Sequence, residues 1–296
     1  MKYVVTGSAG LIGNQLVSDL EQSGQTVYSC YNKHKPLHGI PTKLDLLNLK
    51  EISNVLRKLQ PDVIIHLAAL TDVEKCESEP NLAYLINTKA TEHIVKETNQ
   101  IGCFLTYLST DYVFDGKKGL YYEDDFPNPL NQYGKTKLEG EKAVEHCISH
   151  WSIIRTSTPF GNHLIKQTFP LWIIENIKKN NMLNLIEDQF TTPTYVPNLT
   201  KMIIDVTTNN LVGYFHLSGS TRISRYSFAK MIADKLNLDK SFLKPVKMDM
   251  MQWKAKRPSD SSLNVSKANS ILTQKPLPIE QSLDEYLSQF TDSLYL

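Results

Sequence analysis

The first half of the chain alternates short apolar runs with segments in which apolar residues recur at helical spacing. Strands are predicted at 3–7, 26–31, 62–68, 103–110 and 151–157, and helices at 10–24, 48–60, 80–102 and 130–147. Near-continuous apolar strands that alternate with helices are typical of a parallel sheet covered on both faces. We therefore expect an α/β fold with a doubly wound parallel sheet.

After residue 157 the alternation becomes less regular. Helices are predicted at 168–179, 196–208 and 224–238, and one more strand at 213–219. We expect residues 1–157 to form a first domain that elements near 195–217 complete. Residues 158–296 should form mainly a smaller C-terminal, substrate-binding lobe that is interleaved with the first domain.

Composition narrows the class of protein. The 296 residues are 41% hydrophobic and 21% charged, as in an ordinary globular protein with a sizeable core. The net charge of +1 gives no basic footprint for nucleic acid or a membrane surface. The chain shows no secretory signal pattern and no apolar run of bilayer length, so we expect a cytoplasmic protein. The four cysteines form no CxxC pair or Cys/His cluster, which predicts reduced, mostly structural thiols. We infer no metal site from the sequence.

The stretch "TGSAGLIG" places Gly7, Gly10 and Gly13 directly after the first predicted strand and at the start of a helix. A tight turn, a close backbone approach and a free helix N-terminus are what a dinucleotide pyrophosphate requires. This spacing predicts a Rossmann-type cofactor domain. Backbone contacts are also expected from Ala9, Leu11 and Ile12.

The end of the second strand bears on the choice of cofactor. An acid about 20 residues after the glycines usually binds the ribose hydroxyls of NAD. Here the chain instead offers hydrogen-bond donors and positive charge from Asn32, Lys33, His34 and Lys35. This favours NADP(H), with NAD(H) as the alternative. Asp45 and Leu46 follow a short connection, where Asp45 could meet the adenine or cap the next helix.

Candidate catalytic groups follow the fourth strand. "YLSTDYVFDG" brings Ser109, Thr110 and Asp111 to the carboxyl end of that strand, where open parallel sheets bind ligands. About 23 residues later, Tyr133 and Lys137 stand at i and i+4 and share a helix face. A hydroxyl, a phenol and an ammonium can thus converge on one carbonyl.

These segments together carry a family resemblance. The combination of "TGSAGLIG", "HLAALTDVE", "STDYVFDG", "YEDDFPNPLNQYGKTKLEGE" and "RTS" resembles the extended short-chain dehydrogenase/reductase superfamily. Within it the chain is most similar to the dTDP-4-dehydrorhamnose reductase family, which also includes the regulatory β subunit of methionine adenosyltransferase. The resemblance extends to "KRPSDSSLN", near residue 260.

The resemblance implies NADPH-dependent reduction of the C4 ketone of a nucleotide-linked 4-keto-6-deoxy sugar, with dTDP-4-dehydrorhamnose as the expected example. Tyr133 would give a proton to the developing alkoxide. Lys137 would lower the pKa of that phenol and hold the nicotinamide ribose. Thr110 would hydrogen-bond the substrate oxygen, and Asn87 would support the lysine through water. The cofactor path would be lined by Ala68, Ala69 and Leu70.

Substrate contacts are implied for Asp111, Tyr112 and Arg155, and a nucleotide phosphate contact for Arg257. Segment 187–199 resembles the part of the family fold that closes over the sugar. One departure concerns Thr158, which stands where bacterial rhamnose-pathway reductases usually carry a Trp against the sugar.

Two alternatives stay open on the sequence. One is a non-catalytic, NADP-binding regulatory subunit similar to the methionine adenosyltransferase β subunit. The other is a nucleotide-sugar epimerase or dehydratase, which the missing acid after the second strand disfavours. A homodimer is compatible with the reductase and with both alternatives. A nucleic-acid or membrane partner is not expected.

Overall fold

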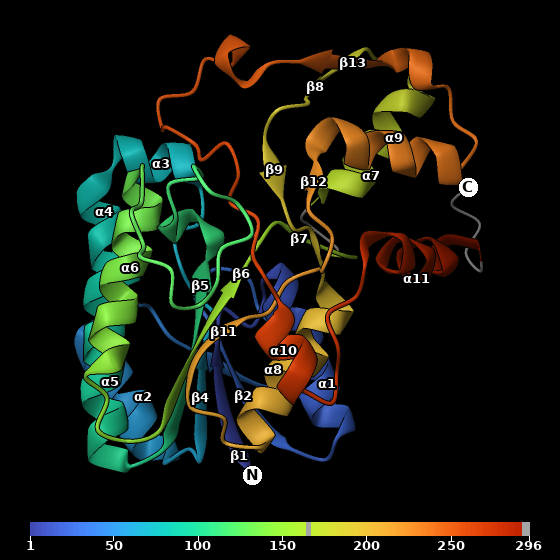
Figure 1. Ribbon diagram of the computed structural model, residues 1–296. Helices are drawn as coiled ribbons and strands as arrows, with labels where there is room; N and C mark the ends of the chain where they lie inside the picture. Colours follow the sequence, from blue (N-terminus) through green and yellow to red (C-terminus); the bar gives the residue numbers. More distant parts are fainter. Residues whose placement is uncertain (164–166, 292–296) are drawn as a thin grey trace.

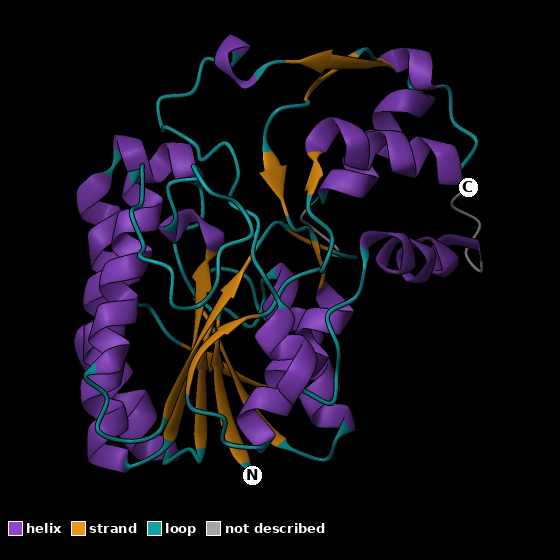
Figure 2. Ribbon diagram, viewed as in Figure 1, coloured by secondary structure: helices purple, strands orange, loops and turns teal. Residues whose placement is uncertain are grey.

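A seven-stranded parallel sheet forms the centre of the first lobe (Figures 1 and 2). The computed structural model describes residues 1–163 and 167–291. The strand order is β11-β6-β5-β4-β1-β2-β3, and all neighbours pair in parallel. The strands are β1 (Lys2–Thr6), β2 (Thr26–Tyr31), β3 (Ile40–Lys43), β4 (Val63–His66), β5 (Phe104–Thr110), β6 (Trp151–Thr156) and β11 (Gly213–His216). The predicted doubly wound α/β fold is confirmed.

Helices cover both faces of this sheet because its strands are apolar on both sides. In β1, Tyr3 and Val5 pack with Leu16, whereas Val4 packs with Ile52 on the opposite face. One face carries α1 (Leu11–Gln22), α8 (Val196–Thr208) and α10 (Ser266–Ile271). The other carries α2 (Leu49–Leu59), α5 (Ala90–Ile101) and α6 (Gln132–Glu145), with the short helices α3 (Val73–Ser78) and α4 (Pro80–Tyr84) preceding α5.

The second lobe is built from short strand pairs and three helices around its own core (Figure 1). Its helices are α7 (Phe169–Lys178), α9 (Arg225–Lys235) and α11 (Ile279–Thr291). Its strand pairs are β7 (Pro159–Phe160) with β10 (Thr194–Tyr195), β9 (Phe190–Thr191) with β12 (Ile223–Ser224), and β8 (Leu183–Ile186) with β13 (Leu243–Val246). Single 3₁₀ turns lie at Asp111–Val113, Lys240–Phe242 and Met248–Met250. Among the described residues, no helix has the length and apolarity needed to cross a bilayer.

Two elements differ from the sequence expectation. Strand β3 was not predicted, because its four residues "IPTK" include Pro41 and lack apolar alternation; it lies at the sheet edge, where proline is tolerated. The helix expected over 80–102 is interrupted by a π-helical turn at Leu85–Lys89. Within that turn the Asn87 amide holds both the N–H (2.8 Å) and the C=O (3.1 Å) of Leu70.

A buried ion pair joins α6 to the sheet. The carboxylate of Glu141 accepts two hydrogen bonds from the guanidinium of Arg155 on β6, at 3.0 and 2.7 Å. Both side chains are almost completely buried. A buried charge without its partner is strongly unfavourable, so each residue depends on the other.

We predict that Arg155→Ala lowers the free energy of unfolding by about 3–5 kcal/mol, because it leaves the Glu141 carboxylate buried and unpaired. The matched control is Lys89→Ala, which breaks the exposed pair with Glu92 and should change the free energy of unfolding far less, because solvent screens an exposed pair. Urea unfolding followed by circular dichroism measures both. Equal small losses would contradict the dependence of α6 on this pair.

Candidate active site

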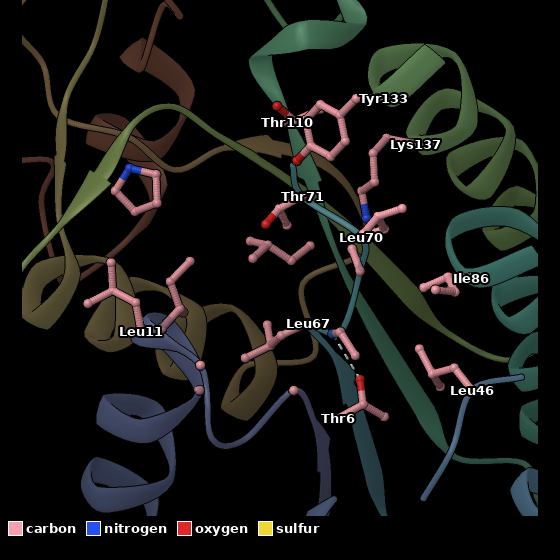
Figure 3. A pocket seen from close by; sticks show the side chains of 18 of the residues that line it. Thr6, Leu11, Leu46, Leu67, Leu70, Thr71, Ile86, Thr110, Tyr133 and Lys137 are labelled. Carbon is pink, nitrogen blue, oxygen red and sulfur yellow. Dashed lines mark hydrogen bonds between the residues drawn. The ribbon is translucent and has the colours of Figure 1, made fainter. Parts of the chain in front are cut away.

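A cavity of about 700 Å³ lies at the carboxyl ends of the parallel strands, where the strand order reverses between β1 and β4. Residues from both lobes line it. Figure 3 labels several of those from the first lobe. Of the residues predicted to bind the cofactor, those that line the cavity are Gly7, Ala9, Gly10, Leu11, Ile12, Gly13, Asn32, Lys33, Asp45, Leu46, Ala68, Ala69, Leu70, Tyr133 and Lys137.

The loop after β1 requires glycine for steric reasons. Gly7 has φ = +69°, and a Cβ there would lie 2.9 Å from the backbone N of Ala68. At Gly13 a Cβ would lie 2.2 Å from the carbonyl oxygen of Gly7. Gly10 is the N-cap of α1 and provides no capping side chain, so the first-turn N–H groups remain open to an anion. This cradle fits a dinucleotide pyrophosphate.

A chain of hydrogen bonds holds the loop after β4 beside this cradle. The N–H of Ala68 donates to the Thr6 hydroxyl at 3.1 Å (Figure 3), and that hydroxyl lies 2.7 Å from His66 Nδ1. His66 Nε2 lies 3.1 Å from the Thr91 hydroxyl on α5. Burial, with a smaller contribution from the charge of nearby Lys137, lowers the pKa of His66 to about 3, so the imidazole stays neutral.

The far end of the cavity carries Asn32, Lys33 and His34, which follow β2, whereas Lys35 does not line the cavity. Asp45 also lines it, and its carboxylate accepts the N–H of Leu47 at 3.0 Å. The cap of the next helix is Asn48, which accepts from the N–H of Glu51. Asp45 therefore does not cap that helix.

The three predicted catalytic residues line the same cavity (Figure 3). Asn131 caps α6 by accepting the N–H of Gly134 at 2.9 Å, which sets the start of the helix. A Cβ at Gly134 would lie 2.2 Å from the carbonyl oxygen of Tyr112, so the helix packs directly on the turn after β5. That packing brings Tyr133 beside Thr110.

The electrostatics of the Tyr133–Lys137 pair differ from the expectation. We expected Lys137 to lower the pKa of Tyr133, but burial raises it above its ordinary value, and the hydrogen bond with Thr110 only partly opposes this. The Lys137 amine lies instead over the ring of Tyr107, 3.9 Å from its centroid. Burial lowers the pKa of Lys137 itself to about 7, against the opposing effect of Glu141. Tyr133 therefore stays a protonated phenol at neutral pH.

Asp111 lies in the cavity wall with both carboxylate oxygens engaged. One oxygen accepts from the hydroxyls of Ser157 (2.8 Å) and Ser261 (2.5 Å), and the other from Thr110 (3.1 Å). Burial raises the pKa of Asp111, and these hydroxyls oppose the rise. The carboxylate thus joins the ends of β5 and β6 to the C-terminal segment.

Two arginines reach the cavity from the second-lobe side. Arg257 donates to Glu74 at 3.1 Å. Arg225, the first residue of α9, makes no ion pair within the described residues. Burial lowers the pKa of Arg225, and the positive charge of Arg257 contributes to the lowering. Sequence reasoning missed Arg225, because an arginine after the capping Ser224 carries no local signal of a tertiary cavity.

Two predicted residues do not line the cavity. Arg155, expected to contact substrate, is paired with Glu141 beneath α6; this expectation is corrected, because the ion pair occupies its guanidinium. Asn87 lies behind the cavity wall, where it holds the backbone of Leu70.

Tyr112 and Thr158 do line the cavity. Thr158 has φ = +43°, which is strained for a β-branched residue. No group of three metal-ligating side chains occurs within the described residues.

Comparisons with known proteins agree with this geometry. The chain is 32% identical to methionine adenosyltransferase 2 subunit beta of Xenopus tropicalis, over 98% of this chain and 88% of that one. It is 33% identical to dTDP-4-dehydrorhamnose reductase of Salmonella typhimurium, over 98% of this chain and 100% of that one. The structure of dTDP-4-dehydrorhamnose reductase from Bacillus anthracis in complex with NADP matches with a TM-score of 0.88 at 29% identity, covering 97% and 99% of the two chains. Residues 1–292 match the RmlD substrate binding domain, and the chain belongs to that family.

Proposed function

We propose that this protein reduces the C4 keto group of a nucleotide-linked 4-keto-6-deoxy sugar with NADPH, with dTDP-4-dehydrorhamnose as the expected substrate. The observation that carries the proposal is a single cavity that contains both the glycine cradle and the Thr110–Tyr133–Lys137 set. The similarity to the Salmonella typhimurium reductase supports the same substrate class.

In this proposal the bound cofactor supplies a hydride to the sugar carbonyl. Tyr133 donates its phenolic proton to the developing alkoxide. Thr110, whose hydroxyl donates to Asp111 in this structure, would turn to hydrogen-bond the same oxygen. Because burial raises the pKa of Tyr133, the phenol is protonated when the reaction begins. The phenolate formed afterwards requires nearby positive charge, which the ammonium of Lys137 provides.

The residues that follow β2, at one end of the cavity, determine the choice between NADP(H) and NAD(H). The backbone of residues 9–13 would hold the pyrophosphate, and the loop from Ala68 to Leu70 would pass beside the nicotinamide. Lys33 would pair with the 2′-phosphate of NADP(H), which disfavours the alternative NAD(H).

The arginines support a diphosphate-bearing substrate. Arg225 and Arg257 raise the local positive potential, and their mutual repulsion is relieved when an anion binds between them. Guanidinium groups form paired hydrogen bonds with phosphate oxygens. Asp111 and Tyr112 would complete the sugar end of the site.

A second candidate is a regulatory NADP-binding subunit, favoured by the similarity to methionine adenosyltransferase 2 subunit beta. A chain of that kind would bind NADPH without turning over any keto sugar. The homodimer and the cytoplasmic location stay predictions.

We predict that the wild-type chain oxidises NADPH when dTDP-4-keto-6-deoxy sugar is added, and that Tyr133→Phe lowers kcat by about 10²–10⁴-fold, the usual scale for a general acid. NADPH binding should change little. Tyr84→Phe, at an exposed tyrosine outside the cavity, is the matched control. Tight NADPH binding without turnover of any keto sugar would favour the regulatory candidate instead.

We predict that Lys33→Ala weakens NADPH binding by about 10- to 100-fold, the scale of a lost charged hydrogen bond, and leaves NADH binding nearly unchanged. Lys35→Ala should have little effect on either cofactor, because Lys35 does not line the cavity. Fluorescence titration with both cofactors separates the cases. Equal weakening of NADH and NADPH by Lys33→Ala would refute the 2′-phosphate contact.

We predict that Arg225→Met raises the KM for the nucleotide sugar by about 10- to 100-fold, because a charged hydrogen bond to phosphate is lost. The KM for NADPH should stay nearly constant. Arg222→Met is the control, since Arg222 pairs with Asp260 and lies outside the cavity lining. An unchanged sugar KM would remove Arg225 from the substrate site.

A further inference from the structure

The ring of Tyr107 lies against the amine of Lys137. Lys137 Nζ is 3.9 Å from the ring centroid, and the two residues are 2% and 0% exposed. Tyr107 comes from β5, directly beneath α6, and does not line the cavity. Its hydroxyl is confined by Gly140, where a Cβ would lie only 2.3 Å away. The ring is therefore held in one orientation by the backbone of α6.

The surroundings of the amine offer few other stabilising groups. Within residues 1–163 and 167–291, Lys137 Nζ has no ion pair and no hydrogen bond to protein. The titratable groups that interact with the amine are His66 from β4, Tyr107 from β5 and Glu141 from α6. Those that act on neighbouring Tyr133 are Asp111 and Tyr112 from the turn after β5 and the Cys76 thiol from α3.

Most of these groups cannot neutralise the ammonium. His66 is neutral, and Tyr107, Tyr112 and Tyr133 are protonated phenols. Asp111 is held by hydroxyls, and the carboxylate of Glu141 is bound to Arg155. Glu141 favours the charged form of the amine through its negative charge, although its carboxylate is hydrogen-bonded to Arg155. The face of the Tyr107 ring is the group that lies in direct contact with the ammonium.

We propose that Tyr107 is a positioning residue, whose ring holds the Lys137 ammonium at the cavity wall by a cation–π contact and keeps it charged. A desolvated contact of this kind is stronger than an exposed one. Because burial brings the pKa of Lys137 to about 7, a small loss of stabilisation changes the charged fraction at neutral pH. The kinetic consequence rests on the proposed reductase function, but the effect on the amine does not.

The first test compares three replacements of Tyr107 with the native protein by their pH profiles of kcat. If the ammonium is the active form, kcat falls as the pH rises through the pKa of Lys137. Tyr107→Phe keeps the ring, so this fall in kcat, the basic limb of the profile, should occur at the same pH. Tyr107→Leu should move it to lower pH by about one unit. Replacing Tyr107 with 3,4,5-trifluorophenylalanine, which keeps the ring size but withdraws its π charge, should shift it in the same direction.

The fluorinated variant keeps the test decisive even where Tyr107→Leu does not fold, because it opens no cavity. A basic limb at the same pH in the phenylalanine and trifluorophenylalanine proteins would overturn the proposal. A limb that moves only in the leucine protein would also overturn it, since that outcome indicates packing rather than the charge of the ring.

The second test measures the protonation of the Lys137 amine in the absence of turnover. Lysines are reductively methylated with ¹³C, and the Lys137 resonance is assigned by its loss in Lys137→Arg. The pH midpoint of the Lys137 titration is then measured by NMR. We expect a lower midpoint in the trifluorophenylalanine protein than in Tyr107→Phe. Equal midpoints would refute the contact. A shifted midpoint in a protein that reduces no keto sugar would support Tyr107 while refuting the reductase function.

Discussion

The buried carboxylate of Asp111 is the constraint on which the cavity depends. It is bound by hydroxyls from the end of β5, the residue after β6, and the segment that returns from the second lobe. A carboxylate in this environment is stable only while those donors surround it. The donors therefore fix the two lobes relative to one another. Thr110, which also accepts the N–H of Tyr112, is oriented by the same arrangement.

Helix α6 places its functional residues by close backbone packing. Gly134 brings its first turn against the turn after β5, and Gly140 brings its middle against the ring of Tyr107. Tyr133, Lys137 and Glu141 follow one another at intervals of four along the buried face. Such a polar face can be buried only because each group meets a matched partner: a hydroxyl, an aromatic ring and a guanidinium.

The features that were predictable from the sequence are those that a local pattern encodes. The glycine loop and the Tyr133–Lys137 spacing depend on neighbours within a few residues, so their place on the fold follows from strand and helix order. The partner of Arg155 lies on another element, and nothing in "RTS" indicates it. Likewise, the direction of the Lys137 amine depends on Tyr107, which reads as an ordinary core aromatic. The strand at Ile40–Lys43 exists only because β2 is beside it.

The hydrogen bond from Ser261 to Asp111 spans 150 residues of sequence. The sheet itself is incomplete until β11 has been synthesised, because that strand forms one of its edges. Contacts of such long sequence separation slow folding, since a large loop must close before they form. During synthesis, the cofactor cradle near the N-terminus can form early, whereas the wall that joins the lobes must wait until almost the whole chain has left the ribosome. Assembly of the site is thus a late step of folding.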